Sequence, residues 1–226
     1  MVTELTEESP GPRKTRKELL SEWRRHEVLE AARRIFAHLG YAAANVDEIA
    51  REAGIAKGTI YLYFKSKEEI FAAALEHDLE CLTAKTVEGM SAVETFSERL
   101  TVFLNMRVAY LRHSQDFLRV YFEEFGSRSS RSPLIAEVID KRFWRGIAAM
   151  RKCVEEAIAN NEIRDVPVEH AAFAIYDIAK GFSERHLRGW ASLSLEEDAA
   201  FTHSLILNGL QTDQFPNTCP SALKES

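Results

Sequence analysis

The amino-acid sequence predicts an all-α protein, with a small three-helix unit at its N-terminus and a larger helical domain behind it. Apolar residues recur at steps of three and four along most of the chain, which is the period of a helix with one buried face. No stretch combines period-two alternation with β-branched residues and hairpin turns. Breaks rich in glycine, proline and asparagine divide the 226 residues into about nine helical segments, enough for two units that each bury a core.

The first helix is expected over residues 22–39, behind a flexible tail over residues 1–21. Gly40 is the expected stop, because glycine tolerates the left-handed backbone that ends many helices. One face of this helix is apolar and carries Val28, Ala32, Ile35, Phe36 and Leu39.

Two short helices follow, over residues 45–53 and 57–64, and meet at Gly54. Asn45 is a favourable N-cap residue, with acidic residues in the turn behind it. Ala50 is small enough to lie where two helices cross, and Gly54 tolerates a positive φ in the turn four positions later. This spacing predicts a helix-turn-helix over about residues 45–64.

The second short helix presents a surface suited to the major groove of DNA. Lys57, Gly58 and Thr59 occupy its N-terminal end, the part of such helices that meets base edges. Gly58 lets the backbone approach closely, and Tyr61 offers an apolar ring and a hydroxyl for a thymine methyl or a phosphate. These residue types at these positions predict DNA binding.

The distribution of charge agrees with a DNA-binding N-terminus. The formal net charge of the chain is −6, but residues 13–70 carry a net +3 and residues 71–226 a net −6. A phosphate backbone responds to the local field rather than to the total charge. The basic residues Arg13, Lys14, Arg16 and Lys17 are a candidate minor-groove arm, and a tail that touches nothing is the alternative.

The segment AKGTIYLYFKSKEEIF, preceded by VDEIAREAGI and by AARRIFAHLGY, closely resembles the DNA-binding domain of the tetracycline-repressor (TetR/AcrR) family. The resemblance covers about residues 22–82. It implies an all-helical homodimer of about nine helices per chain, a palindromic operator, and release from DNA when a small molecule binds.

Carried over residue by residue, the resemblance assigns base contacts to Lys57, Gly58, Thr59 and Tyr61. It assigns phosphate contacts to Asn45, Tyr63 and Lys67. Asn45 stands where the family usually has threonine, and both residues can cap a helix and bind a phosphate. Leu62 stands at a position that is often polar or aromatic, so one backbone contact of the family is in doubt.

Beyond a fourth helix that begins at Ser66 and ends near residue 87, residues 83–212 form the expected ligand-binding and dimerisation domain. Its helices are predicted near residues 92–113, 115–125, 133–160, 167–189 and 195–211, with a tail over residues 213–226. Apolar and aromatic stripes on these helices are typical of a core, and a ligand pocket would look the same. The candidate ligand-binding residues are Phe103, Arg107, Tyr110, Phe122, Phe143, Trp144, Phe173, Tyr176 and Asp177.

Charged groups that interrupt these apolar faces are Arg107, Asp177, Lys180 and Glu184, for which salt bridges within the domain are the alternative reading. The last two helices are the expected dimer surface, because they combine small residues with an apolar edge. The residues expected there are Ala171, Ala172, Ala174, Ala179, Gly181, Phe201, Leu205, Ile206, Gly209 and Leu210.

The sequence argues against an enzyme, a metal protein and a membrane protein. Its seven histidines form no His-x-x-x-His or Glu-x-x-His pair, and its three cysteines lack metal-ligand spacing. No apolar run approaches the roughly 20 residues that span a bilayer. We expect a cytoplasmic, ligand-responsive repressor without cofactor or metal; a DNA-binding regulator that is controlled by a protein partner and has no small-molecule pocket is the alternative.

Overall fold

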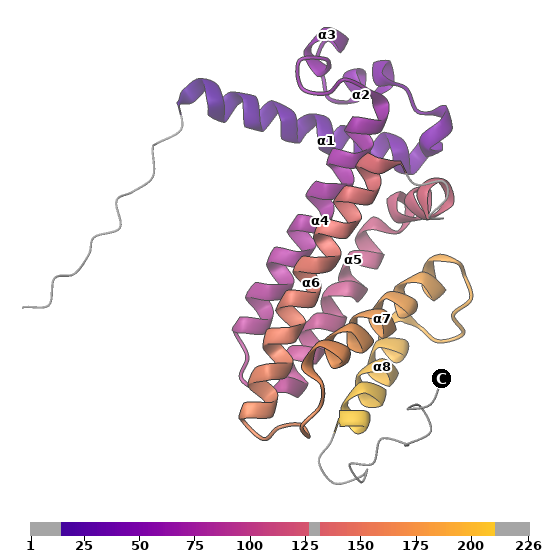
Figure 1. Ribbon diagram of the computed structural model, residues 1–226. Helices are drawn as coiled ribbons and strands as arrows, with labels where there is room; N and C mark the ends of the chain where they lie inside the picture. Colours follow the sequence, from indigo (N-terminus) through magenta and orange to yellow (C-terminus); the bar gives the residue numbers. More distant parts are fainter. Residues whose placement is uncertain (1–14, 127–131, 211–226) are drawn as a thin grey trace, which may run out of the picture.

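The computed structural model describes residues 15–126 and 132–210, and within these ranges every regular element is a helix (Figure 1). The all-α prediction is therefore confirmed. The described residues form eight helices rather than about nine: α1 (Arg16–Ala43), α2 (Val46–Glu52), α3 (Lys57–Ile60), α4 (Lys67–Ser91), α5 (Phe96–Phe125), α6 (Pro133–Ala159), α7 (Val168–Leu187) and α8 (Leu195–Leu210).

The first helix begins six residues earlier than the sequence predicted, so the expected tail over residues 1–21 is wrong for its last part. Thr15 is the N-cap and forms a capping box with Glu18, in which each side chain binds the other residue's backbone N–H. These two reciprocal bonds satisfy helix-end donors and start α1 at Arg16. In Figure 1 the N-terminal half of α1 projects beyond α2 and α3.

Gly40 interrupts α1 where a stop was predicted. Its φ of 77° and ψ of 167° lie outside the helical region, and the turn that follows ends at Ala43. A side chain at this φ would meet its own backbone, which is why glycine serves here.

The helices predicted over residues 92–113 and 115–125 are one continuous helix, α5. The polar residue between them, Ser114, is buried, and its hydroxyl donates to Asp78 Oδ2 on α4 at 3.4 Å. Because Ser114 bonds across to a neighbouring helix instead of capping a new one, it does not break α5. This long helix explains the difference in helix count.

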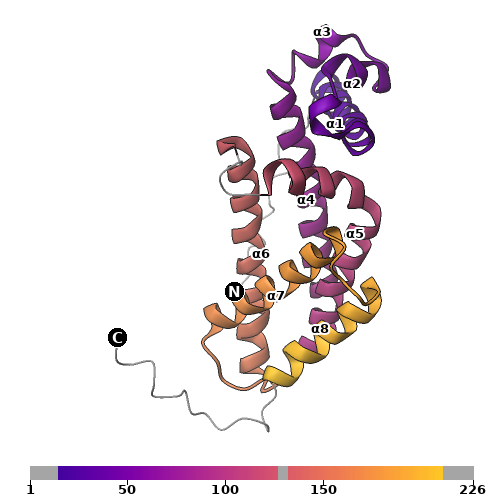
Figure 2. The ribbon, with the colours of Figure 1, turned by 90° about the vertical axis from the view of Figure 1, so that its right-hand side faces the viewer.

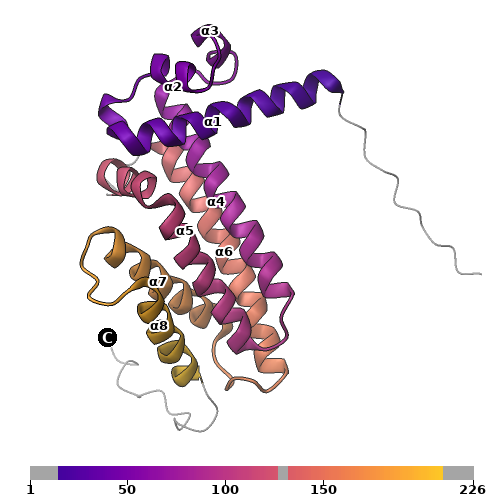
Figure 3. The same ribbon diagram turned by 180° about the vertical axis from the view of Figure 1, so that it is seen from behind.

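Three long helices, α4, α5 and α6, pack side by side and form the body of the molecule (Figures 1 and 3). Figure 2 shows α7 running between α6 and α8, which both contact it. One core cluster contains residues of the first four helices, of the C-terminal end of α5 and of the start of α6. A second joins the remainder of α5 and α6 to α7 and α8. The end of α5 therefore belongs to the core of the N-terminal unit.

Aromatic rings fill the junction between the two units. The ring centre of Phe71 on α4 lies 5.1 Å from that of Phe36 on α1 and 5.1 Å from those of Phe117 and Phe125 on α5. Tyr41 closes the cluster, 5.0 Å from Phe125. Edge-to-face and tilted ring pairs of this kind stabilise packing beyond simple burial. The junction is thus a packed interior and not a hinge of loose contacts.

Along the described ranges, no helix is both long enough and apolar enough to cross a membrane.

Candidate functional site

The helix-turn-helix is formed by α2, the turn at Gly54 and α3. Asn45 caps α2: its Oδ1 accepts from the Glu48 N–H at 2.9 Å, and the Glu48 carboxylate accepts from the Asn45 N–H at 3.2 Å. Gly54 has a φ of 66°, the positive value that the turn was expected to need. Ile49 and Ile60 are fully buried beneath the two helices. The apolar anchors thus hold α3 on the surface with its outer face free.

The outer face of α3 presents a cation, a glycine and an exposed aromatic ring. Lys57 is exposed and forms an ion pair with Asp47 at 2.8 Å; this hydrogen bond raises the pKa of Lys57. Gly58 has open space at its missing Cβ, and Thr59 is half-buried. Tyr61 is 48% exposed, and Leu62 beside it is 81% exposed. Neither of these two side chains is buried in the core, so both are available for contact with another molecule.

Tyr63 is partly committed to the fold. It is half-buried against the core of the N-terminal unit, and its hydroxyl accepts from Ser21 Oγ on α1 at 3.4 Å. Phe64 is buried beneath α3, with the Arg25 guanidinium 5.3 Å from its ring centre. Tyr63 can present its hydroxyl at the surface, whereas Phe64 is a packing residue.

Lys67 has a different role from the predicted phosphate contact. Its Nζ donates to the carbonyl oxygens of Tyr41, Ala42 and Ala44 at 2.7, 3.2 and 3.0 Å. An ammonium group has three donors, and all three are used here. Lys67 also lies 4.5 Å from the Tyr41 ring centre. It therefore ties the start of α4 to the turn after α1, where carbonyl groups lack helical partners.

The candidate basic arm is only partly described. Arg16 and Lys17 lie in the exposed first turn of α1. Arg13 and Lys14 lie outside the described residues, as does most of the predicted tail over residues 1–21, and as does the predicted tail over residues 213–226.

The larger unit contains a cavity of about 520 Å³ between α4, α5, α6 and α7. This volume lies in the usual range of small-molecule sites. Six of the nine candidate ligand-binding residues line it: Arg107, Tyr110, Phe122, Phe143, Tyr176 and Asp177. Leucines of α4 and α5 supply much of the remaining wall, among them Leu75, Leu79 and Leu118. The cavity therefore combines an apolar wall with five charged side chains, those of Arg107, Asp140, Arg142, Asp177 and Lys180.

The other three candidates lie elsewhere. Phe103 is buried beneath Arg107 and contacts a smaller neighbouring space. Trp144 is 57% exposed, and Phe173 packs against it and against Phe143 on the outer side of α6 and α7. Helical periodicity could not separate these residues from the lining ones, because both sets lie on half-apolar faces.

Arg107 is the dominant charge of the cavity, and it has no carboxylate partner in the part of the chain that is described. The residue is 7% exposed. Its guanidinium donates to the Phe103 carbonyl oxygen at 3.2 Å and lies 3.7 and 5.1 Å from the ring centres of Phe103 and Tyr176. Burial, with a smaller contribution from Arg142, lowers the pKa of Arg107 to about 9. The Tyr176 side chain opposes this shift. A desolvated cation that has no carboxylate partner among the described residues is suited to receive an anion.

Two further polar groups of the cavity lack partners. The buried Tyr110 hydroxyl and Arg142 Nε make no hydrogen bond within the described residues. Burial, and the nearby Asp78 carboxylate, raise the pKa of Tyr110. Buried polar atoms are nearly always paired in folded proteins, so orphaned ones mark places where a ligand or water belongs. Both atoms are donors, which again indicates an acceptor-bearing ligand.

Arg142 was not among the charged residues that the sequence analysis singled out in this region. Lys180 and Asp177 line the cavity from exposed positions on α7, and Asp140 does so from α6. Glu184 instead pairs with Arg188 at 2.8 Å. Arg142 directly precedes the candidate residues Phe143 and Trp144, and a charge beside aromatic residues was the available signal.

The residues predicted for the dimer surface divide into exposed and buried ones. Phe201 and Leu205 on α8 are 57% and 53% exposed, and Ala174 on α7 is also exposed. Ala172, Ala179 and Ile206 are buried in the protomer's own core, so they cannot face a partner. An apolar edge on α8 therefore remains for contact with a second chain.

Comparisons with known proteins agree with this geometry. The family model described as "Bacterial regulatory proteins, tetR family" matches residues 28–74. The uncharacterized HTH-type transcriptional regulator YhgD of Bacillus subtilis is 29% identical over 150 residues, covering 66% of this chain and 76% of its own length. The HTH-type transcriptional repressor KstR2 of Mycolicibacterium smegmatis is 26% identical over 192 residues, covering 84% and 92%.

Among solved structures, the transcriptional regulator FadR from Bacillus subtilis in complex with stearoyl-CoA has the same fold. Its TM-score is 0.70 at 22% sequence identity, over 82% of this chain and 99% of that chain. The likeness thus extends well beyond the residues that the family model matches.

Proposed function

From the premise that this chain belongs to the tetR family of bacterial transcriptional regulators and is not an enzyme, we propose that it is a homodimeric repressor. It binds a palindromic operator in the cytoplasm, where the DNA is, and a small amphipathic anion releases it. The observation that carries the ligand proposal is the buried Arg107, which has no carboxylate partner among the described residues and lines a cavity of about 520 Å³. Repression is favoured because the relative KstR2 is named a repressor.

The DNA-binding part of the proposal rests on α3. Lys57, Gly58, Thr59 and Tyr61 would meet base edges and adjacent backbone in the major groove. The first three form the start of α3, and the exposed Tyr61 follows its last residue. Asn45 and Tyr63 would contact phosphates. Lys67 would support them indirectly, because its donors hold the turn after α1.

Leu62 adds an apolar contact that the family resemblance did not predict. At 81% exposure its side chain is available to a thymine methyl group or a sugar.

Two copies are needed because one short helix makes few contacts. The exposed residues Phe201 and Leu205 on α8 would pair with their counterparts across a two-fold axis. The symmetry would place the two α3 helices in successive major grooves, about 34–36 Å apart, and so require a palindromic site.

The proposed ligand has an apolar body and a negatively charged head. The leucine and aromatic wall would hold the body, while Arg107, Arg142 Nε and the Tyr110 hydroxyl would bind the head. Asp140 and Asp177 also line the cavity, but both are exposed, whereas Arg107 is buried. The relative solved with stearoyl-CoA, an acyl chain on an anionic carrier, supports this ligand class.

The coupling between the two sites would run through α5. Leu118, Tyr121 and Phe122 line the cavity, and Phe117 and Phe125 on the same turns pack against Phe71 in the junction. A ligand that pushes this part of α5 would shift α1 and α4 and change the separation of the two α3 helices. It can do so only in proportion to its different affinity for the two states.

The ligand step is tested by fluorescence anisotropy on an operator obtained by selection from random DNA. Dodecanoate and stearoyl-CoA are added to the bound protein, with dodecanol as the uncharged control. We expect the anions, but not dodecanol, to lower operator affinity at least fivefold, as coupling energies of about 1–3 kcal/mol allow. Unchanged affinity with all three, together with no thermal stabilisation, would contradict ligand control by such anions and favour regulation by a protein partner.

A further inference from the structure

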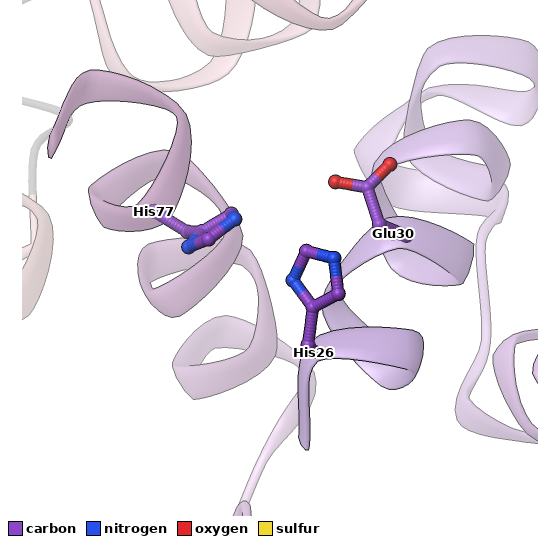
Figure 4. Close-up of side chains that lie close together, drawn as sticks. All are labelled: His26, Glu30 and His77. Atoms are coloured by element: carbon purple, nitrogen blue, oxygen red, sulfur yellow. The ribbon is translucent and has the colours of Figure 1, made fainter. Parts of the chain in front are cut away.

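Two histidines and a glutamate converge where α1 crosses α4. His26 and Glu30 lie one turn apart on α1, and His77 lies on α4 opposite them (Figure 4). One nitrogen of each imidazole and one carboxylate oxygen all lie within 4.8 Å of one another. The two rings meet edge to face, with their centres 4.9 Å apart. Figure 4 shows all three side chains pointing into the same space between the helices.

The neighbouring charged groups are committed elsewhere. Arg33, the next cation along this face of α1, pairs with Asp78 at 3.1 Å and reaches the His113 carbonyl oxygen. Glu76 pairs with Lys141 on α6. The half-buried Glu30 carboxylate has no hydrogen bond or ion pair within residues 15–126 and 132–210. Glu30 and the two imidazoles therefore present three potential ligand atoms to one space.

We propose that His26, Glu30 and His77 bind a divalent transition-metal ion, with zinc as the expected occupant and solvent in the fourth position. Imidazole and carboxylate ligands in this ratio are typical of zinc sites that keep one open position. Magnesium and calcium prefer oxygen ligands and would not compete. The Cys81 thiol, 3.9 Å from His77 Nε2, lies next to the site but outside the group of three.

The geometry needs only side-chain rotation to close. Ligand atoms in a tetrahedral zinc site with bonds of about 2.0–2.1 Å lie about 3.4 Å apart. The present separations of up to 4.8 Å therefore have to shorten by roughly 1.4 Å. His26 is exposed and Glu30 and His77 are half-buried, so none of them is locked in the core.

An ion at this place would fasten the helix-turn-helix unit to the connecting helix α4. Binding would stabilise the folded chain, because the three ligands converge only when α1 and α4 are packed. The site is separate from the cavity and from the outer face of α3, so it does not depend on the proposed ligand. The sequence signal for this site is the His-x-x-x-Glu spacing of His26 and Glu30 on the first helix.

The experiment measures zinc binding to the full-length protein after removal of metals with a chelator. Competition with a chromophoric zinc indicator gives the affinity and stoichiometry, and thermal unfolding with and without zinc gives the stabilisation. We expect one zinc per chain in the wild type. In His77→Gln and in Glu30→Gln the affinity should fall at least tenfold, and the thermal shift with zinc should disappear. The matched control is His170→Gln, an exposed histidine on α7, which should bind like the wild type.

Unfolding of the metal-free variants guards against a folding artefact. Without metal, His77→Gln and the wild type should unfold within a few degrees of each other, because the half-buried His77 is not part of the core. The proposal is overturned if the wild type binds less than one zinc per chain at micromolar concentrations. It is equally overturned if His77→Gln and Glu30→Gln bind zinc as the wild type does, since the ion would then lie elsewhere.

Discussion

The guanidinium carbon of Arg107 lies 3.7 Å from the ring centre of Phe103, one turn before it on α5. In the described chain, this buried cation contacts two aromatic rings and a backbone carbonyl but no carboxylate. An apolar residue at this position would give a more stable fold, because a buried charge without a counter-charge costs free energy. The pair therefore indicates that Arg107 is kept for a ligand that supplies the missing negative charge.

Arg107→Met should separate ligand binding from folding. Methionine fills similar space without a charge, so the free energy of unfolding should stay within about 1 kcal/mol of the wild type or rise. The thermal stabilisation by dodecanoate should disappear. Arg99→Met is the matched control on the same helix: Arg99 pairs with Glu156 and does not line the cavity, so the response to dodecanoate should persist. A variant at Arg107 that is strongly destabilised would show instead that the arginine is structural.

The affinity for an anion should depend on pH with a defined sign. Burial lowers the pKa of Arg107 to about 9, so the guanidinium is charged below that pH and loses its proton above it. Dodecanoate should bind with constant affinity from about pH 7 to about pH 8.5 and more weakly as the pH rises through about 9. Bound anion favours the charged form and moves this midpoint upward. Isothermal calorimetry checks it, and a flat profile through about pH 10 would contradict the lowered pKa of Arg107.

Gly146 on α6 sets the position of Tyr176 in the cavity wall. A Cβ at Gly146 would lie 2.4 Å from Cε2 of the Tyr176 ring, so an alanine forces the buried ring to move. Gly146→Ala should destabilise the protein by about 1–3 kcal/mol and weaken dodecanoate binding. Gly58→Ala on α3, measured without DNA, is the matched control, because its Cβ would meet nothing within 4 Å. It should be neutral or stabilising by up to about 1 kcal/mol. Chemical denaturation distinguishes the two, and equal effects would refute the packing argument.

The apolar edge of α8 should control the oligomeric state. Replacing Phe201 and Leu205 together by glutamate places two like charges opposite their own copies across a two-fold axis, which a dimer interface cannot accept. Light scattering should report a monomer, and operator binding should be lost with it. Leu134→Glu, an exposed leucine on α6, is the control and should remain dimeric. A dimer that survives the double substitution would place the interface on another surface.

The local signals in the sequence were the reliable ones. Asn45, Gly40 and Gly54 have the cap and backbone conformations that their residue types predicted, because caps and turns are decided within four residues. Ser114 misled the prediction, since its partner Asp78 is far away in sequence and only the packed helices bring the two together.

The cavity could be predicted only in outline. Arg107 and Tyr176 line it, whereas Trp144 points outward, although all three lie on half-apolar helix faces. Which residues of a helix line the cavity depends on how α6 and α7 cross. Helical periodicity in the sequence does not give the angle or position of that crossing. Lys67 shows the same limit: the resemblance assigned it to phosphate, but the turn after Gly40 places three carbonyl groups within its reach.

The most direct test of the account is selection of binding sites from random DNA with the full-length wild type, Tyr61→Ala and Trp190→Ala. The exposed Trp190 is the matched aromatic control, remote from α3. The account predicts that the wild type and Trp190→Ala enrich one palindrome. Tyr61→Ala, whose fold should be intact, should bind that site at least tenfold more weakly, in line with about 1–3 kcal/mol for a base contact. If the wild type enriches no palindrome and binds DNA only at low salt, α3 does not read sequence and the account fails at its centre.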